Sequence, residues 1–405
     1  MKILFVDAYF YPERIAFSHL ENDIIEGLLA AGHEVHVICP TPTRGITDEE
    51  YRRYKHRRQE EHNGVHITRF RAPREKKNPV VRALRYFWCN LREYQIGRRF
   101  RDADAVFAVS TPPTQGLLAG RLAKKLKVPL VYSLQDLFPD SLVTTGLTSR
   151  SSLLYKIGAW VEKKTYARCH KIIVISQTFR DTLLKKQVPG DKLVKVTNWI
   201  DTSAVAPVAR EANPLFEEFA IPRDRFCVVY AGNFGASQGT DVILKAAALL
   251  KDDTRLQFVI FGGGNEFAQA KEYAEAHALD NVMMHPLLPI ERTAEVYSLG
   301  DVALITCKKG VGKVAMPSKT WSIMACNTPI IASFDTDSEL AAILRQSGAG
   351  VCTEPENPQA LANAVKAAAG AAVSSNGGRQ YAVEHASKTA CVAAYVKCFE
   401  QRKNG

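Results

Sequence analysis

Short apolar runs alternate with helical patterns along the whole chain. The runs are rich in β-branched residues, and the segments between them repeat apolar residues at helical spacing. Strands separated by helices in this way form parallel sheets with crossover connections. The sequence therefore predicts an α/β protein, with the strands ILFV, EVHVIC, VHITRF, AVFAVS, LVYSL and KIIVIS in its first half and CVVYAG, QFVIFGGG, VALITC, PIIAS and AGVCTE in its second.

One stretch interrupts this alternation near the middle of the chain. Residues 202–225 are polar, contain proline and show no periodicity, which is typical of a linker. A chain of 405 residues also exceeds the length served by one ordinary core. We therefore predict two doubly wound domains, residues 1–200 and residues 201–385.

The end of the first strand in the second domain is a predicted ligand site. Residues 230–239 read YAGNFGASQG, and ligands of open α/β sheets bind outside the carboxyl ends of strands. Gly232, Gly235 and Gly239 allow a ligand to approach the main chain, and Asn233 and Gln238 add polar groups. A tight turn that binds nothing is the alternative. The matching loop of the first domain is DAYFYPERIAFSH, so a cleft between the two domains is expected.

Charge is distributed unevenly along the chain. Residues 51–102 hold 16 Lys and Arg against 5 Asp and Glu, whereas the remainder holds 37 of each sign. The whole excess of +11 therefore comes from one segment. Within it, Leu84, Phe87, Trp88, Leu91 and Tyr94 recur at helical spacing among arginines, which suggests that residues 80–101 form an interfacial helix at an anionic membrane. The alternative is that this apolar stripe packs on its own domain and only the arginines face outward.

Cysteine usage and the amino-terminal residues favour a cytoplasmic protein. The nine cysteines are scattered, with no CxxC pair and no histidine at ligand spacing, so we expect buried, reduced thiols. The first apolar run is too short for a signal peptide, and no apolar segment has the length of a membrane span.

Several motifs together resemble the retaining glycosyltransferases of family 4, which have the GT-B fold. They occur in the family's order and cover almost the full chain: AAGHEVHVI, LQDLFPDS, KIIVISQTFRDTL, VTNWID, YAGNFGASQG and MPSKTWSIMACNTPIIAS. The combination YAGN, QG and PSK is most similar to the branch that contains N-acetyl-fucosaminyl transferases of bacterial surface polysaccharides.

This resemblance implies a function for each domain. The second domain is expected to bind a nucleoside diphosphate sugar, most simply a UDP-sugar, and the first an acceptor that is a glycan or is linked to undecaprenyl diphosphate. Transfer with retention requires no metal and no cofactor in this family. The last helix, residues 386–405, is expected to cross back to the first domain.

The resemblance also assigns site residues. Asp136 is expected to contact the reacting sugar or the acceptor hydroxyl, and Lys319 to meet the charge that grows on the leaving diphosphate. Ser18 and His19 occupy the family's acceptor loop, which is not glycine-rich here. The remaining donor-binding candidates are Gly232, Asn233, Gly235, Gln238, Gly239, Asn198, Pro317, Ser318, Ser322 and Glu339.

Three positions depart from the family pattern. Val314 and Ser322 stand where most members carry two glutamates, the second of which holds the ribose hydroxyls. Glu339 is the carboxylate left to take that part. Gln238 replaces a basic residue of the glycine loop, so the cation must come from elsewhere, and Lys319 is the candidate.

Two further patterns favour ordinary turns. The DTD sequence at residues 335–337 resembles a metal-binding motif of another glycosyltransferase fold, but a polar turn is the better interpretation. The three glycines at 262–264 could bind phosphate, although a tight turn is again favoured.

Two other functions of the protein remain open, namely a nucleotide-sugar 2-epimerase of the same fold and a basic nucleic-acid-binding protein.

Overall fold

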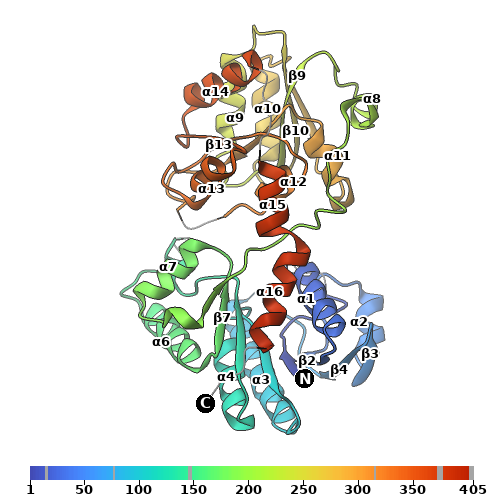
Figure 1. The fold of residues 1–405 in the computed structure, drawn as a ribbon, viewed down its shortest axis with the longest axis vertical. Coiled ribbons are helices and arrows are strands. Elements are labelled where there is room, and N and C mark those ends of the chain that lie inside the picture. Colours follow the sequence, from blue (N-terminus) through green and yellow to red (C-terminus); the bar gives the residue numbers. More distant parts are fainter. Residues whose placement is uncertain (14–16, 76–77, 145–147, 314–315, 372–376, 401–405) are drawn as a thin grey trace. The chain divides into compact units, whose positions relative to one another are not determined.

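The protein divides into two compact units, which Figure 1 shows as ribbons. The computed structural model describes residues 1–13, 17–75, 78–144, 148–313, 316–371 and 377–400. Unit 1 comprises residues 1–197 and the chain from Cys391 onward, and unit 2 comprises residues 198–390. The predicted domain boundaries, 200/201 and 385/386, lie three and five residues from these divisions.

Unit 1 contains an eight-stranded sheet in the order β3-β4-β2-β1-β5-β6-β7-β8. All neighbours pair in parallel except β3 and β4. The sequence did not predict β3 because QEEH has no apolar residue and lies at the edge of the sheet. The strands are β1 (Lys2–Val6), β2 (Glu34–Pro40), β3 (Gln59–His62), β4 (Val65–Phe70), β5 (Ala105–Val109), β6 (Leu130–Leu134), β7 (Lys171–Val174) and β8 (Leu193–Lys195).

Helices cover both faces of this sheet. One face packs against α3 (Pro79–Gly97), α4 (Gln115–Leu126), α6 (Leu153–Arg168) and α7 (Gln177–Lys185), through a core that includes Leu4, Leu122 and Tyr166. The helices α1 (Ser18–Ala30) and α16 (Lys388–Glu400) pack against each other. The ring of Phe107 in β5 contacts the rings of Tyr395 and Phe399 in α16. The last helix therefore belongs to the fold of unit 1 from Cys391 onward.

Unit 2 contains a six-stranded sheet in the order β11-β10-β9-β12-β13-β14, and every pair is parallel. Apolar clusters lie on both faces of this sheet. Its helices include α9 (Asp241–Leu249), α10 (Phe267–Ala276), α12 (Lys319–Ala325), α13 (Glu339–Ser347), α14 (Pro358–Gly370) and α15 (Gly378–Ala386). The strands are β9 (Phe226–Asn233), β10 (Leu256–Gly263), β11 (Val282–Pro286), β12 (Val302–Thr306), β13 (Ile330–Ser333) and β14 (Gly350–Thr353).

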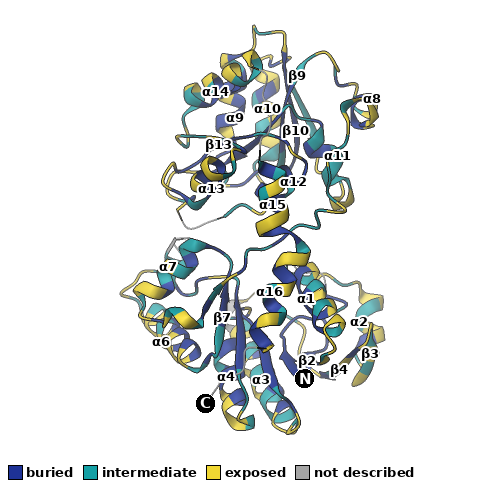
Figure 2. Cartoon of the chain, viewed as in Figure 1, coloured by how far each residue is buried: buried dark blue, intermediate teal, exposed yellow. Residues whose placement is uncertain are grey.

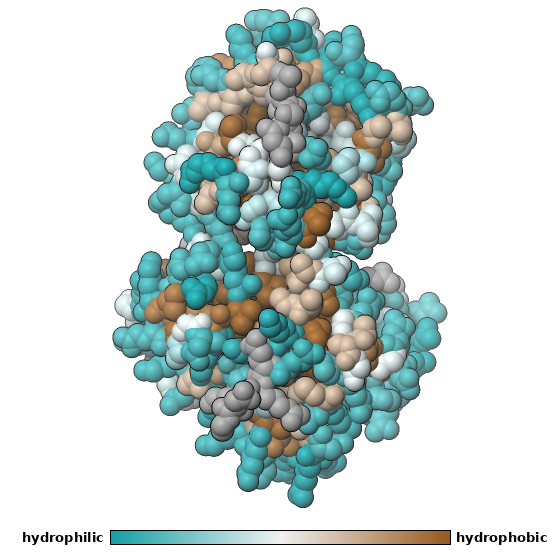
Figure 3. Space-filling model, in the orientation of Figure 1, coloured by the Kyte–Doolittle hydropathy of each residue, from teal (hydrophilic) through white to brown (hydrophobic). Residues whose placement is uncertain are grey.

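The central strands are buried, whereas some helices expose apolar side chains. The central strands are dark blue in Figure 2, because parallel sheets covered by helices are buried on both faces. Apolar residues nevertheless reach the surface of unit 1, where Figure 3 shows some of them in brown. Among the described residues, the exposed large apolar side chains of unit 1 are concentrated in α3 and α6. All nine cysteines lie among the described residues. None of them forms a disulfide, and eight are buried.

Candidate active site

The glycine-rich segment of unit 2 begins inside a strand. Gly232 and Asn233 are the last two residues of β9, where they pair in register with Gly262 and Gly263 of β10. The chain then turns over residues 234–240, and the Phe234 N–H donates to the Gly263 carbonyl at 2.6 Å. Two glycine-rich strand ends therefore lie side by side at the carboxyl edge of the sheet, where α/β proteins bind their ligands.

Close packing explains two of these glycines. Gly239 has a φ of +57°, and a Cβ at this position would lie 3.1 Å from the carbonyl carbon of Cys307. Gly264 has a φ of +110°, and its Cβ would lie 2.3 Å from Oδ1 of Asn233. Of the three glycines at 262–264, the first two thus end β10 and the third makes the predicted turn.

The turn presents main-chain donors without acceptors. Within the described parts of the chain, no hydrogen bond from the N–H groups of Gly235, Ala236 and Ser237 is found. The turn itself is fixed, because the Gln238 N–H donates to the Gly235 carbonyl at 3.0 Å and the Lys308 N–H to the Ser237 carbonyl at 3.0 Å. Adjacent N–H groups held in a turn form a concave site that suits an anion.

Lys319 brings a cation to this strand end. It is the first residue of α12, and its Nζ lies 4.1 Å from the centre of the Tyr230 ring. A Cβ on Gly232 would lie only 2.5 Å from the same Nζ, so the glycine makes room for the ammonium group. Among the described residues, no carboxylate forms an ion pair with Lys319. Burial lowers the pKa of Lys319 to about 7.

The other donor-binding candidates lie in the same unit. Asn198 and Ser322 are half-buried, and Pro317 and Ser318 lead directly into α12. Glu339 begins α13, where its charge raises the pKa of Tyr381, although burial of that phenol is the larger cause. Val314, one of the positions that depart from the family pattern, lies outside the described residues.

Asp335 has a structural role that the sequence did not reveal. Its carboxylate accepts hydrogen bonds from the N–H groups of Gly310 and Gly312, each at 2.9 Å, and it is almost completely buried. Asp337 pairs with Lys313 at 2.7 Å. The DTD segment therefore shapes the loop after β12, which in turn packs against the glycine turn through Lys308.

The acceptor-side candidates all lie in unit 1. Asp136 follows β6, is exposed and accepts a hydrogen bond from Ser141 at 3.1 Å, and desolvation raises its pKa. Ser18 begins α1 and donates to the Glu13 carbonyl at 3.1 Å. The side chain of His19 is exposed on the same helix.

A cluster of buried carboxyl groups near β1 and α1 was not predicted. Asp7, Glu13 and Glu21 are each at least 97 % buried. Glu13 accepts hydrogen bonds from the N–H groups of Thr43 and Arg44 at 2.7 Å, and burial still raises its pKa to about 7. Burial also raises the pKa values of Asp7 and Glu21, which favours their protonated forms. The only sequence signal was an Asp immediately after an apolar strand.

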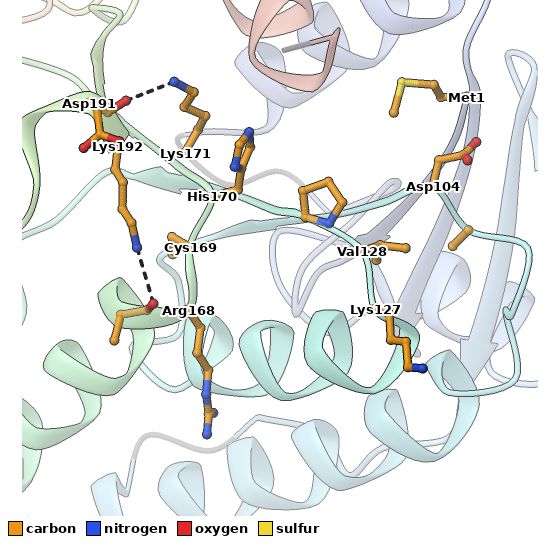
Figure 4. Close-up of a pocket in the computed structure, with 13 residues that line it drawn as sticks. Met1, Asp104, Lys127, Val128, Arg168, Cys169, His170, Lys171, Asp191 and Lys192 are labelled. Atoms are coloured by element: carbon orange, nitrogen blue, oxygen red, sulfur yellow. Dashed lines mark hydrogen bonds between the residues drawn. The ribbon is translucent and has the colours of Figure 1, made fainter. Parts of the chain in front are cut away.

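A cavity of about 870 Å³ lies at the amino-terminal ends of the unit 1 strands, opposite to the ends that carry the carboxyl cluster. Its lining is basic and includes Lys127, Arg168, His170 and Lys171. Figure 4 shows that Lys127 and Arg168 point away from His170 and Lys171, so these groups do not converge on one ligand. The amino-terminal ends of strands are also the wrong edge for the chemistry of this fold class.

Two family models match the chain in tandem. The description "Glycosyl transferase 4-like domain" matches residues 22–199, and "Glycosyl transferases group 1" matches residues 212–370. The first match covers most of unit 1 and ends two residues beyond its boundary at residue 197, and the second lies within unit 2. The chain consists of the two domains of a GT-B glycosyltransferase. The resemblance inferred from the sequence motifs is thereby confirmed at the level of the fold and the enzyme class.

Individual proteins agree with this assignment. WcaI of Escherichia coli K12, named as a colanic acid biosynthesis glycosyl transferase, is 24% identical over 91% of this chain and 92% of its own length. The glycosyltransferase WbjE of Pseudomonas aeruginosa is 28% identical over 73% of this chain and 74% of its own.

Solved structures share the GT-B fold of this glycosyltransferase. Sucrose-phosphate synthase of Thermosynechococcus elongatus aligns over 99% of this chain and 98% of its own, with a TM-score of 0.72 and 17% identity. HepE of Anabaena, in complex with UDP, aligns over 99% of this chain and 100% of its own, with a TM-score of 0.71 and 14% identity.

Proposed function

We propose that this glycosyltransferase moves a sugar from a UDP-sugar to a hydroxyl group of a glycan or lipid-linked acceptor, with retention of anomeric configuration. One observation carries the proposal. Among the described residues, the N–H groups of residues 235–237 after β9 have no acceptor, and Lys319, which pairs with no carboxylate there, lies against Gly232 at the end of the same strand. A diphosphate requires such a combination of aimed N–H groups and a cation.

Transfer with retention can proceed without a covalent intermediate. The acceptor oxygen bonds to the anomeric carbon on the face from which UDP departs, while the bond between that carbon and the β-phosphate oxygen breaks. The electron pair of the broken bond stays on the phosphate, which also receives the proton of the acceptor hydroxyl. Negative charge therefore grows on the diphosphate, and donors already fixed in place stabilise the transition state more than the bound substrate.

Lys319 is suited to respond to that charge. Its lowered pKa means that burial disfavours the charged form while no anion is bound. A diphosphate beside Nζ favours the ammonium and raises its pKa again. We therefore assign the cation of the donor site to Lys319 and propose that no metal or cofactor takes this part.

The remaining roles follow the family resemblance. Glu339 is proposed to hold the ribose hydroxyls in place of Ser322, and Asp136 to contact the sugar or the acceptor hydroxyl. Ser18 and His19 are proposed to line the acceptor side. Asn198, Pro317 and Ser318 are proposed to border the donor.

The names of the relatives support a role in surface polysaccharide synthesis. WcaI is named for colanic acid biosynthesis, and HepE was solved with UDP and with UDP-glucose. We propose a polysaccharide acceptor carried on undecaprenyl diphosphate, reached from the cytoplasmic side of the membrane. An N-acetyl-fucosaminyl donor is the first to test, because the motifs are most similar to that branch.

A ligand panel followed by a product assay tests the proposal. Melting temperatures are measured with UDP-, GDP-, ADP- and dTDP-sugars, since a ligand at 100 times its Kd stabilises by about 2.7 kcal/mol. We expect UDP-sugars alone to stabilise the wild type, and Lys313→Ala, a nearby lysine variant, to respond equally. NMR of the product should then show the anomeric configuration of the donor.

Two results would contradict the proposal. Stabilisation by no sugar nucleotide would remove the donor site. Conversion of a UDP-sugar to its 2-epimer in the absence of an acceptor would instead establish the epimerase of the same fold.

A further inference from the structure

Helix α3 exposes most of its apolar stripe and buries two charged side chains. Its apolar stripe is exposed over three turns, with Leu84 65% and Phe87 71% accessible. Arg85 and Glu93 lie on the buried side of the same helix. Arg85 donates to the Pro73 carbonyl at 2.9 Å, and Glu93 accepts from Gln115 at 2.9 Å. The alternative in which the stripe packs on its own domain is therefore wrong for Leu84, Phe87, Trp88 and Leu91, whereas Tyr94 packs against the core of unit 1.

Helix α6 repeats this arrangement, which the sequence did not suggest. Leu153 is 73% accessible and Trp160 50%, and both lie in the first two turns of the helix. Figure 2 shows exposed residues of α6 in yellow. Glu162 is buried instead, where it accepts from Lys186 at 2.6 Å and from Tyr166 at 2.9 Å. Internal polar networks thus fix the orientation of both helices, and no element among the described residues covers their exposed apolar side chains.

Helix α4 lies between α3 and α6 on the same face of the sheet. It adds no exposed acid, because its exposed charged residues are Arg121, Lys124 and Lys125. The acidic residues of α3 and α6, Glu93 and Glu162, are both buried. We call the exposed part of these three helices the α3–α6 surface. Its members are Val81, Leu84, Phe87, Trp88, Leu91, Arg121, Lys124, Lys125, Leu153, Leu154, Lys156, Ile157, Trp160, Lys163 and Lys164.

The sheet topology determines which end of the α3–α6 surface is apolar and which is basic. Each of the three helices follows the carboxyl end of one parallel strand and returns to the amino-terminal end of the next. The apolar residues lie in the first turns of α3 and α6, whereas Lys124 and Lys125 lie in the last turn of α4, and Lys163 and Lys164 lie in the second half of α6. The apolar end therefore lies toward the edge of the sheet at which substrates of this fold class bind.

We propose that the α3–α6 surface docks on an anionic lipid bilayer, with the side chains of α3 and α6 inserted between headgroups. Leucine, phenylalanine and tryptophan suit the interfacial region, and lysine and arginine suit anionic headgroups. A second copy of the chain is a poorer partner, because the charged members of this surface are all basic and an isologous contact would bring them close to one another. No helix in the described parts is long and apolar enough to span a membrane.

This inference deepens the proposed function, since a docked unit 1 would meet a lipid-linked acceptor where it is presented. Its test needs neither donor nor acceptor, so the two proposals can fail separately. The protein carries natural probes: Trp88 and Trp160 lie on the α3–α6 surface, whereas Trp199 and Trp321 are buried. We expect a blue shift of tryptophan emission when vesicles of phosphatidylglycerol and phosphatidylcholine are added at low salt, and little change with phosphatidylcholine alone.

Double variants measure separately how much α3, α6 and the lysines of α4 each contribute to vesicle binding. Leu84→Ser with Phe87→Ser should weaken vesicle binding at least about tenfold, and Leu153→Ser with Ile157→Ser should do the same. Lys124→Glu with Lys125→Glu should weaken binding to anionic vesicles on the order of tenfold or more. The matched controls, Leu249→Ser with Ile290→Ser and Lys251→Glu with Lys271→Glu, change exposed residues of unit 2 and should bind like the wild type.

Three outcomes would overturn the proposal. The first is a wild type that does not bind anionic vesicles in flotation at low salt. The second is equal loss of binding in the unit 2 controls. The third is a dimer in sedimentation that the α3 and α6 variants dissociate, which would make this surface a contact between copies.

Discussion

Strands β1 and β9 occupy equivalent places in their sheets, and each leads through a loop into a helix. After β1 the loop is associated with the buried carboxyl groups of Asp7, Glu13 and Glu21, which favour the protonated state. After β9 it presents free N–H groups beside Lys319. The same topology thus carries acids at one strand end and donors at the other, so only the second suits a diphosphate.

Among the variants that test this comparison, the one that removes the cation beside β9 should have the largest effect on catalysis. Lys319→Ala is expected to lower kcat by on the order of 100- to 1,000-fold with a smaller change in donor affinity, because the phosphate charge grows as the glycosidic bond breaks. Steady-state kinetics and donor titration separate the two quantities. Lys313→Ala, six residues earlier and paired with Asp337, should leave both unchanged. Wild-type turnover in Lys319→Ala would exclude Lys319 from the chemistry.

Filling the space beside the ammonium should have the next largest effect. Gly232→Ala places a methyl group 2.5 Å from the present position of Nζ, so the lysine must move. We expect UDP to bind on the order of tenfold more weakly, the cost of one charge-assisted hydrogen bond. Because the φ of Gly232 is +158°, an alanine there also strains the backbone, and we expect a lower melting temperature as well. Gly370→Ala is the control, since no atom lies within 4 Å of its added Cβ. Equal UDP affinity in wild type and Gly232→Ala would mean that Lys319 does not approach the diphosphate there.

The lowered pKa of Lys319 should make donor binding depend on pH. Above about pH 7 the amine is largely neutral in the free protein, and a bound diphosphate favours its protonation. Binding at pH 8 should therefore take up a proton, and affinity should fall as pH rises from 7 to 9. Calorimetry in two buffers of different ionisation enthalpy measures the uptake. Lys319→Arg, which stays charged, should show none, and an equal uptake in this variant would assign the proton to another group.

The acid cluster should produce a smaller effect, on stability alone. A carboxyl group whose pKa is raised by folding contributes stability at low pH and loses it as pH rises through the raised pKa. Wild type should therefore lose stability between pH 6 and pH 9, and Glu21→Gln, which stays neutral, should lose less by a few degrees in melting temperature. Glu26→Gln, exposed on the same helix, should follow the wild type. Parallel melting curves for Glu21→Gln and wild type would show that Glu21 is ionised in the folded protein.

The sequence determined the α/β class, the order of the central strands along the chain and the glycine-rich strand end, because periodicity and glycine spacing are local properties. It also pointed to Lys319, through the motif that precedes α12. It could not place Nζ beside Gly232, since the two residues are far apart in the chain and meet only through the order of β9 and β12.

Only the tertiary structure decided which face of a helix is buried. The apolar stripe of α3 left two interpretations open, a stripe that faces a membrane and a stripe that packs inward. Arg85 and Glu93 lie inside because Pro73, Gln115 and their neighbours supply hydrogen-bond partners there. The same holds for Glu162 of α6 and for the acids after β1. A local pattern measures how apolar a face is, whereas burial of a charge depends on partners from distant segments, and only the folded chain brings those partners together.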